Sequence, residues 1–169
     1  MRWILDACTI IYLIKAKLFK QFISLVKFPV VIDSTVNQEV VIEGKANNYP
    51  DAFEAESVLN EFKIPIISID VSKDLYRFSD PGETSCYLLA LEQGVCIISD
   101  ERAYRKLVNE NVQVIRLDTF YYEKYRQKQI NKNEFLLILN KLESVYATKP
   151  KSILFFMKKL QEKEDGKND

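Results

Sequence analysis

The sequence predicts an α/β protein in which helices cover both faces of a five-stranded parallel sheet. Five short runs rich in Val and Ile alternate with stretches whose apolar residues recur every three or four positions. The runs are nearly continuous in apolar residues, which is typical of parallel strands buried on both faces. Strands that alternate with amphipathic helices favour a three-layer α/β/α arrangement. The chain has 169 residues, 47% of them hydrophobic, and is long enough to bury such a core.

Turn and helix signals set the bounds of the elements. We expect strands at residues 2–5, 29–32, 64–69, 95–99 and 113–117. Apolar periodicity predicts helices between them, which include residues 10–14, 18–26, 36–41, 50–62 and 87–91. Pro50 suits the first turn of its helix, and Gly94 is the expected C-terminal cap of the helix before the fourth strand.

Three further helices are expected after the fifth strand: residues 120–128, a helix from Asn131 to Tyr146 that opens with a capping box to Glu134, and one after Pro150. We therefore divide the chain into a sheet domain at 1–118, a C-terminal helical extension at 119–163 packed on or beside it, and a frayed tail at 164–169.

Aromatic residues are frequent in this extension. Six of them look exposed and indicate a surface for a partner: Phe120, Tyr121, Tyr122, Tyr125, Phe155 and Phe156. The alternative is that these helices pack on the flank of the sheet domain. Packing is favoured for Phe135 and Leu139, and for the tyrosines both alternatives stay open.

Composition limits the chemistry and the location of the protein. The absence of histidine excludes Ser-His-Asp and Cys-His catalysis and histidine zinc ligands. Three cysteines with no C-x-x-C pair predict neither a disulfide framework nor a zinc knuckle. The 24 basic and 24 acidic residues balance, so net charge does not bear on nucleic-acid binding. No membrane-spanning run or signal-peptide layout is found, so we expect a cytoplasmic protein.

Four acidic residues lie at strand-to-helix junctions or in first helical turns: Asp6, Glu39, Glu83 and Asp100. A single acid in such a place is more often a helix cap, as we expect for Asp80. Four at the same edge of a parallel sheet are harder to explain as caps, because ligands bind where strand order reverses. Carboxylates gathered in one cleft repel one another unless cations compensate their charge. The pattern predicts a site for Mg²⁺ or Mn²⁺.

The segments around these acids resemble the PIN domain family, and within it the VapC-like ribonucleases with a G-E motif. The resemblance covers residues 2–117 and rests on L-D-A-C-T, V-N-Q-E-V, D-P-G-E-T-S-C-Y-L-L-A and I-I-S-D-E-R-A-Y-R-K-L. It implies a five-stranded parallel sheet between helices and a metal-dependent endoribonuclease that hydrolyses RNA phosphodiester bonds. It also implies that the catalytic, metal-binding residues are Asp6, Glu39, Glu83 and Asp100.

The chain departs from the family pattern at three places. Cys8 stands where a Ser or Thr is common, with Thr9 beside it; Glu83 replaces a more frequent Asp; and Glu101 follows Asp100 in place of Asp. Thr9 is a candidate for the missing hydroxyl. Glu101 either contacts the metal ligands or is solvated, and solvation is slightly favoured.

The resemblance also implies partners. RNA is the expected substrate, with Arg102, Arg105 and Lys106 as candidate phosphate contacts or, equally, a solvated helix face. An antitoxin protein and a homodimer are further expectations, as for the toxin of a type II toxin-antitoxin pair. The alternative function is a noncatalytic PIN-like module that binds RNA or protein. A haloacid-dehalogenase-type phosphatase is disfavoured because Cys8 stands where its second Asp belongs.

Overall fold

A computed structural model describes residues 1–78 and 80–165, and in this part of the chain five strands form one parallel sheet. The strands are β1 (Arg2–Leu5), β2 (Val30–Asp33), β3 (Ile66–Ile67), β4 (Gly94–Ile97) and β5 (Val114–Ile115). All five predicted strands are confirmed. β3 and β5, the two edge strands, pair over only two residues each.

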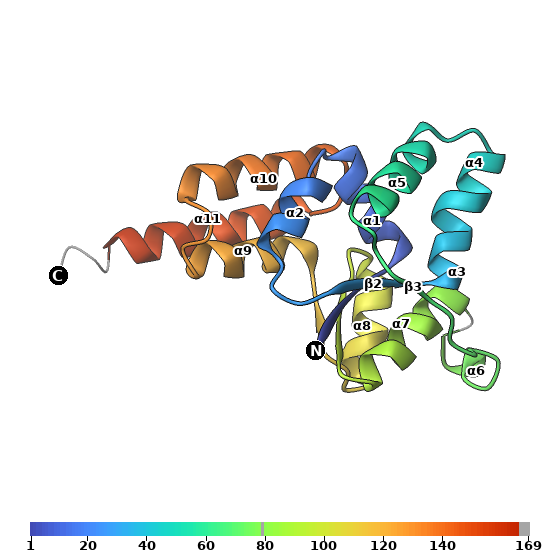
Figure 1. Cartoon of the computed structure of the whole chain (residues 1–169). Coiled ribbons are helices and arrows are strands. Elements are labelled where there is room, and N and C mark those ends of the chain that lie inside the picture. Colours follow the sequence, from blue (N-terminus) through green and yellow to red (C-terminus); the bar gives the residue numbers. More distant parts are fainter. Residues whose placement is uncertain (79, 166–169) are drawn as a thin grey trace.

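Helices fill the intervals between the strands and continue after β5 (Figure 1). In chain order they are α1 (Ala7–Lys15), α2 (Phe19–Leu25), α3 (Ser34–Asn37), the π-helical η1 (Gln38–Glu43), α4 (Gly44–Ala46), α5 (Pro50–Glu61), α6 (Leu75–Phe78), α7 (Pro81–Leu91), α8 (Glu101–Asn109), α9 (Leu117–Arg126), α10 (Lys132–Ser144) and α11 (Pro150–Asp165). The predicted capping box is present, since Asn131 and Glu134 each accept a hydrogen bond from the other's backbone N–H.

The sheet has the order β3-β2-β1-β4-β5 and separates two hydrophobic cores. Successive side chains of a strand point to opposite faces, so Leu5 and Ile97 belong to the larger core while Ile4 and Cys96 belong to the smaller one. The larger core is covered by α1, α2, α5 and the C-terminal helices, and the smaller one by α7 and α8. This is the three-layer α/β/α architecture that the sequence predicts.

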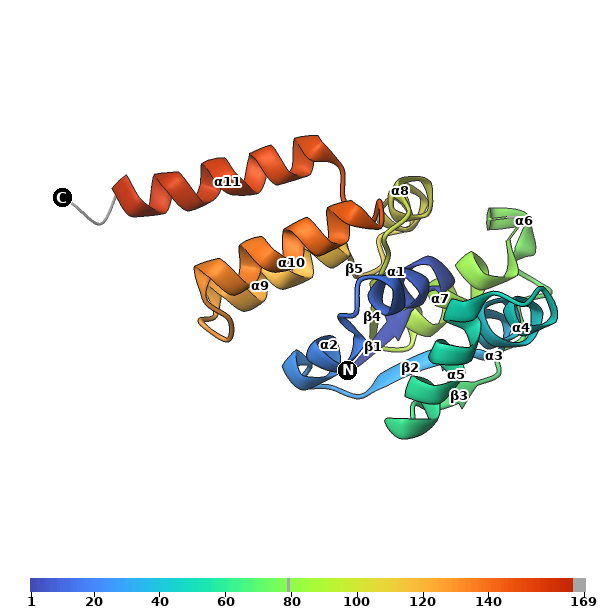
Figure 2. The same cartoon turned by 90° about the horizontal axis from the view of Figure 1, so that it is seen from above.

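The C-terminal helices pack on the larger core, on the same side of the molecule as α2 (Figures 1 and 2). The expectation that their aromatics are exposed is wrong for Phe120, Tyr121 and Phe156, which are at least 95% buried. Leu117, Phe120, Tyr121 and Lys124 recur at helical spacing and form the inner face of α9. Phe120 contacts Trp3 of β1 edge-on, with ring centroids 5.5 Å apart. The packing predicted for Phe135 and Leu139 is confirmed, since both are fully buried.

Gly94 is not the C-terminal cap that the sequence suggested. It is the first residue of β4, and Gln93 adopts the left-handed conformation with φ 75°. A Cβ at Gly94 would lie 2.1 Å from Cδ1 of Ile4, so close packing between adjacent strands explains the glycine.

The last helix is longer than the sequence suggested. Helix α11 continues to Asp165, past the start of the expected tail at 164, and residues 166–169 lie outside the described residues. None of the described helices is both long enough and apolar enough to cross a membrane.

Candidate metal centre

Asp6 and Asp100 lie together at the centre of the sheet's carboxyl edge. β1 and β4 are neighbours with Leu5 opposite Ile97, so the residues that follow the two strands meet at one place. Both side chains cap helices: one Oδ1 accepts from the backbone N–H of Thr9 at 2.8 Å, the other from that of Ala103 at 2.8 Å. A cap uses only one of the two carboxylate oxygens, so capping and ligand binding are compatible roles here.

Glu39 approaches this place from a helix that starts at β2. Asp33, the last residue of β2, caps α3 by accepting from the backbone N–H of Thr35 at 2.7 Å. The helix then widens into the π-helical turn η1, which carries the exposed Glu39. π-Helical turns are rare and are frequently found at functional sites.

Asp80 reaches the same region from the start of α7. It caps that helix, as predicted, by accepting from the backbone N–H of Glu83 at 2.7 Å. A Cβ built on Gly82 would lie 3.3 Å from Oδ1 of Asp80 and 3.8 Å from Oε2 of Glu39. The carboxylates of Asp80 and Glu39 therefore converge on the open side of Gly82, where any side chain would crowd them.

The pKa values of groups at the site are shifted in a way that is consistent with this convergence. Burial, together with the charges of Asp100 and Glu39, raises the pKa of Asp6 to about 7 from an ordinary value of 3.8. The pKa of Cys8 rises to about 12 through burial and through the charges of Asp6, Asp100, Glu39 and Asp80. Partial burial of its carboxylate and the charge of Asp80 raise the pKa of Glu39, although the residue as a whole is exposed. Four carboxylates from four segments thus contribute to the raised pKa of the Cys8 thiol.

Glu83 is placed differently from the other three predicted ligands. Its carboxylate accepts a hydrogen bond from Nζ of Lys106 on α8, and the same ammonium donates to the carbonyl of Phe78 at 3.2 Å. Glu83 therefore already has a cationic partner.

The residues present fit a hard divalent cation. Among residues 1–78 and 80–162, whose side chains are described, no lysine or arginine forms an ion pair with Asp6, Glu39, Asp80 or Asp100. In the same part of the chain, no three acidic or cysteine side chains stand in a ready-made metal cage. Mg²⁺ does not require one, because it keeps several waters and is held by one or two carboxylates together with substrate phosphates. The donor set consists of carboxylate oxygens, which such cations prefer.

Two neighbours of the acids have well-defined contacts. Thr9 is buried, its hydroxyl donates to the carbonyl of Ile97 at 3.0 Å, and it lies 3.1 Å from the hydroxyl of Ser99, so it ties α1 to β4. Glu101 is partly exposed and accepts hydrogen bonds from both Arg116 and Arg105. The hydrogen bond from Arg116 is the main cause of a lowered pKa at Glu101.

The three basic residues expected to bind RNA have different surroundings. Arg102 is exposed and, among the described residues, has no ion-pair partner. Arg105 is exposed and pairs with Glu101, while Lys106 is engaged by Glu83. Arg102 is thus the one most available for a phosphate.

Sequence reasoning missed three residues of this site or assigned them a smaller role. Asp80 was given only a capping role, although its charge reaches both Glu39 and Cys8. Asp33 is fully buried, and its Oδ2 has no hydrogen-bond partner among the described residues. It ends the apolar run of β2, the signal that would have found it. Tyr12 lies close enough for the charges of Cys8, Asp100 and Asp6 to contribute to a raised pKa, after burial.

Comparisons with known proteins agree with this architecture. Residues 2–142 match the model of a family described as DUF3368, a PIN domain. None of the curated proteins is similar enough to count as a relative. Among solved structures, a domain of a functionally unknown protein from Methanocaldococcus jannaschii DSM 2661 is similar, with a TM-score of 0.51 and 13% identity over 69% of this chain and 90% of that one. At this identity the likeness concerns the fold alone. Because the family model covers most of the chain, the protein belongs to the PIN domain family, whose fold is of the nuclease type.

Proposed function

We propose that this protein is an endoribonuclease that depends on Mg²⁺ or Mn²⁺ and hydrolyses RNA phosphodiester bonds at the acidic edge of β1 and β4. The observation that carries the proposal is the placement of Asp6 and Asp100 at one edge of the sheet and of Glu39 and Asp80 beside Gly82, with no ion-pair partner for any of the four among the described residues. Such a cluster is costly in a folded protein unless a cation binds it. Membership of the PIN family supports a nuclease.

The roles of the chain's own residues follow from their positions. Asp6 and Asp100 would hold the cation with their second carboxylate oxygens, because their first ones are fixed by the caps of α1 and α8. Glu39 would complete the set or orient the attacking water from the exposed side. When bound, the cation would lower the pKa of a water molecule and neutralise charge on the phosphate. No histidine is required for this chemistry, in agreement with a chain that has none.

We include Glu83 as a further proposed metal ligand, and this role requires that it first be released by Lys106. In the structure Lys106 holds its carboxylate, and both side chains are about one quarter exposed. A lysine on a flexible stem can turn to solvent or to an RNA phosphate, which would free Glu83 for the cation. This pairing is also the feature that favours the alternative function, a noncatalytic module that binds RNA or protein.

The deciding experiment is cleavage of a labelled structured RNA by the purified protein with Mg²⁺ or Mn²⁺. Parallel reactions contain EDTA or the Asp100→Asn variant, whose amide oxygen can still cap α8. We expect cleavage that requires both the metal and Asp100. Absence of cleavage, together with no metal binding by calorimetry, would reject the nuclease and favour the noncatalytic module.

A more specific proposal rests on the resemblance to VapC-like toxins. The nuclease would be the toxin of a type II toxin-antitoxin pair, acting as a homodimer and inhibited by an antitoxin protein. Induced expression of the wild-type protein in a bacterial host is then expected to stop growth, whereas Asp100→Asn is tolerated. Equal growth with both forms, at equal protein levels, would argue against a toxin.

A further inference from the structure

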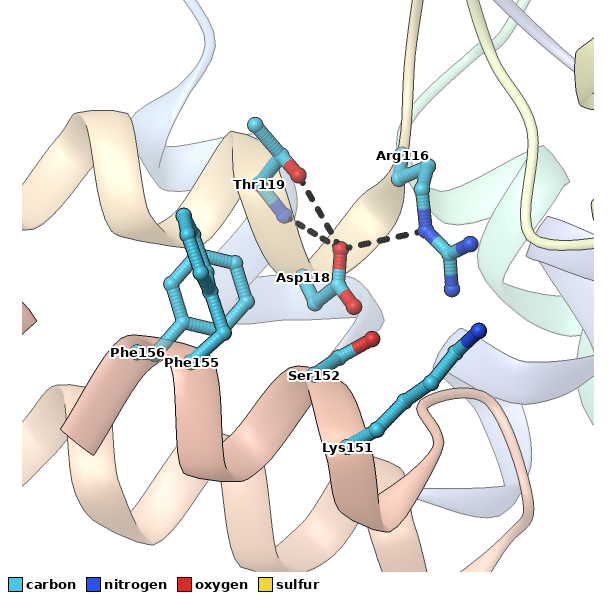
Figure 3. A pocket seen from close by; sticks show the side chains of 7 residues that line it. All are labelled: Arg116, Asp118, Thr119, Lys151, Ser152, Phe155 and Phe156. Atoms are coloured by element: carbon cyan, nitrogen blue, oxygen red, sulfur yellow. Dashed lines mark hydrogen bonds and ion pairs between the residues drawn. The ribbon is translucent and has the colours of Figure 1, made fainter. Parts of the chain in front are cut away.

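The carboxyl edge of the sheet changes its charge between β4 and β5. Asp100 follows β4, whereas the residue that follows β5 is Arg116, at the N-terminus of α9. Beside Arg116, a pocket of about 300 Å³ opens between the first turn of α9 and the first two turns of α11 (Figure 3). Its lining consists of Arg116, Asp118, Thr119, Lys151, Ser152, Phe155 and Phe156. This volume is at the lower end of the range for small-ligand sites.

The carboxylate in this pocket is already balanced. Asp118 is 98% buried and accepts from the backbone N–H of Thr119 at 2.7 Å and from the hydroxyl of Thr148 at 2.6 Å. Nε of Arg116 lies 3.5 Å from it. These contacts satisfy the buried charge, so Asp118 fixes the position of Arg116 and has little charge left to repel an anion.

Cations exceed carboxylates around the pocket. Arg116 also donates to Glu101, and Nζ of Lys149 lies 4.0 Å from the same carboxylate. Lys151 has no ion-pair partner in the described part of the chain, and Figure 3 shows its ammonium and the guanidinium of Arg116 pointing toward each other. Arg116, Lys149 and Lys151 are three cations against the two carboxylates of Asp118 and Glu101, so the pocket region has a net positive charge that favours an anion.

The other end of the pocket offers an aromatic surface. Phe156 is buried and contacts Tyr122 and Phe135 with ring centroids 5.1 and 5.7 Å away. Phe155, next to it, is 55% exposed, and its ring lies edge-on to that of Phe156 with centroids 5.4 Å apart. An exposed ring backed by a buried one is suited to stacking of a nucleic-acid base.

We propose that this pocket binds one nucleotide of the RNA substrate, with its phosphate on Arg116 and Lys151 and its base against Phe155. The inference rests on the proposed ribonuclease function and adds a substrate subsite to it. Glu101 links the two places, because it follows Asp100 directly and binds Arg116. An RNA strand that passes the acidic centre would thus also meet cations at this pocket. Residues 151–156 lie outside the family match at 2–142, so the subsite is a feature of this chain's C-terminal helix.

The test is direct binding of a fluorescein-labelled single-stranded RNA of about ten nucleotides, measured by anisotropy in EDTA so that no cleavage occurs. Phe155→Ala is expected to weaken binding by about five-fold or more, the effect of losing one base stack. The matched control is Leu154→Ala, which removes a side chain 68% exposed on the same helix but outside the pocket. Lys151→Ala is expected to lower the salt dependence of binding by about one ion, with the exposed Lys158→Ala as its control.

The outcomes separate this inference from the nuclease proposal. If wild type cleaves RNA with Asp100 and metal but Phe155→Ala and Lys151→Ala bind as wild type does, the subsite is rejected and the ribonuclease stands. If these two variants lose binding while no form cleaves, the subsite stands and the nuclease is rejected. The subsite is also rejected if the control variants lose as much RNA affinity as Phe155→Ala and Lys151→Ala, or if wild type binds no RNA. If the pocket instead binds an acidic protein segment, the two pocket variants would bind RNA as wild type does, which rejects the subsite as well.

Discussion

Two groups of carboxylates lie along the same sheet edge and are balanced in opposite ways. Asp6 and Asp100, after β1 and β4, have no cationic partner in the described part of the chain, whereas Glu101 and Asp118, beside β5, share Arg116. Burial is the main cause of a raised pKa at Asp6, and the hydrogen bond from Arg116 is the main cause of a lowered pKa at Glu101. The pKa of the same type of side chain is thus shifted in opposite directions at two places along one edge.

The difference indicates which carboxylates serve the fold and which require a ligand. A buried acid with hydrogen-bonded cations is a complete structural unit. An acid that is desolvated beside other acids costs folding free energy, and such arrangements cluster at functional sites. By this criterion the β1–β4 end is the better candidate for the proposed metal site, and the β5 end is a structural region beside the proposed nucleotide subsite.

The largest expected effect is on catalysis. Asp6→Asn should lower RNA cleavage by about 1,000-fold or more, because a metal contributes several kcal/mol of transition-state stabilisation and about 1.4 kcal/mol corresponds to ten-fold. Glu101→Gln, in the balanced group, should cost less than about ten-fold. The measurement is the single-turnover cleavage rate in saturating Mg²⁺, with circular dichroism to verify folding. Equal losses in the two variants would contradict the distinction between the groups.

The second effect is on the pH dependence of stability without metal. Because the folded-state pKa of Asp6 is about 7 and its ordinary value is 3.8, folding favours the protonated acid. Its contribution is complete below about pH 4 and is lost as the pH rises toward 7. Asp6→Asn removes this loss and keeps the cap, so it should be more stable than wild type at pH 8, by up to about 4 kcal/mol, and similar to it near pH 4.

Urea unfolding in EDTA at pH 4 and pH 8 measures this difference. Added Mg²⁺ should stabilise wild type at pH 8 and have little effect on the variant. A variant less stable than wild type at pH 8 would show that Asp6 is a structural acid like Asp118.

The third expected effect is a loss of stability, the opposite of the gain expected for Asp6→Asn at pH 8. Asp118→Ala removes a buried carboxylate that is bound to Thr119, Thr148 and Arg116, and it should lower the free energy of unfolding by about 3 kcal/mol. Urea unfolding at pH 7 is the measurement, with Thr119→Ala, at a half-buried position, as a smaller change within the same network. A loss below about 1 kcal/mol would mean that the β5 end does not depend on this ion pair.

Much of this comparison is present in the sequence, because local patterns determine strands and caps. The apolar runs predicted all five strands and placed Asp6 and Asp100 at a shared edge of the sheet, and Asp80 was correctly predicted to cap its helix. The sequence did not show which residues the long charged side chains contact across the fold. The pairs Glu83–Lys106 and Glu101–Arg116 join residues 23 and 15 positions apart and depend on how α7, α8 and β5 pack.

The same limit explains the remaining errors. The aromatics of α9 looked exposed because helical periodicity gives a buried face but not the element that covers it, and Trp3 of the first strand is part of that cover. Asp80 was recognised as a cap, and its nearness to Glu39 appears only when α7 and η1 are brought together at Gly82. The spacing of residues along the chain does not indicate that α7 and η1 approach each other at Gly82.

The smallest expected effect concerns Glu83, a carboxylate that Lys106 balances and that would lose its cationic partner if Lys106 were replaced. Lys106→Met removes the cation that holds Glu83 while keeping an apolar stem over the Phe78 ring, where Nζ lies 5.9 Å from the centroid. If Glu83 is a metal ligand, its release should tighten Mg²⁺ binding a few-fold in calorimetry without RNA, and Glu83→Gln should weaken it. If Asp80 is the ligand from α7, both variants should bind Mg²⁺ as wild type does and only Asp80→Asn should bind it less tightly. The comparison would then assign Glu83 to the fold and Asp80, the nearer neighbour of Glu39, to the metal.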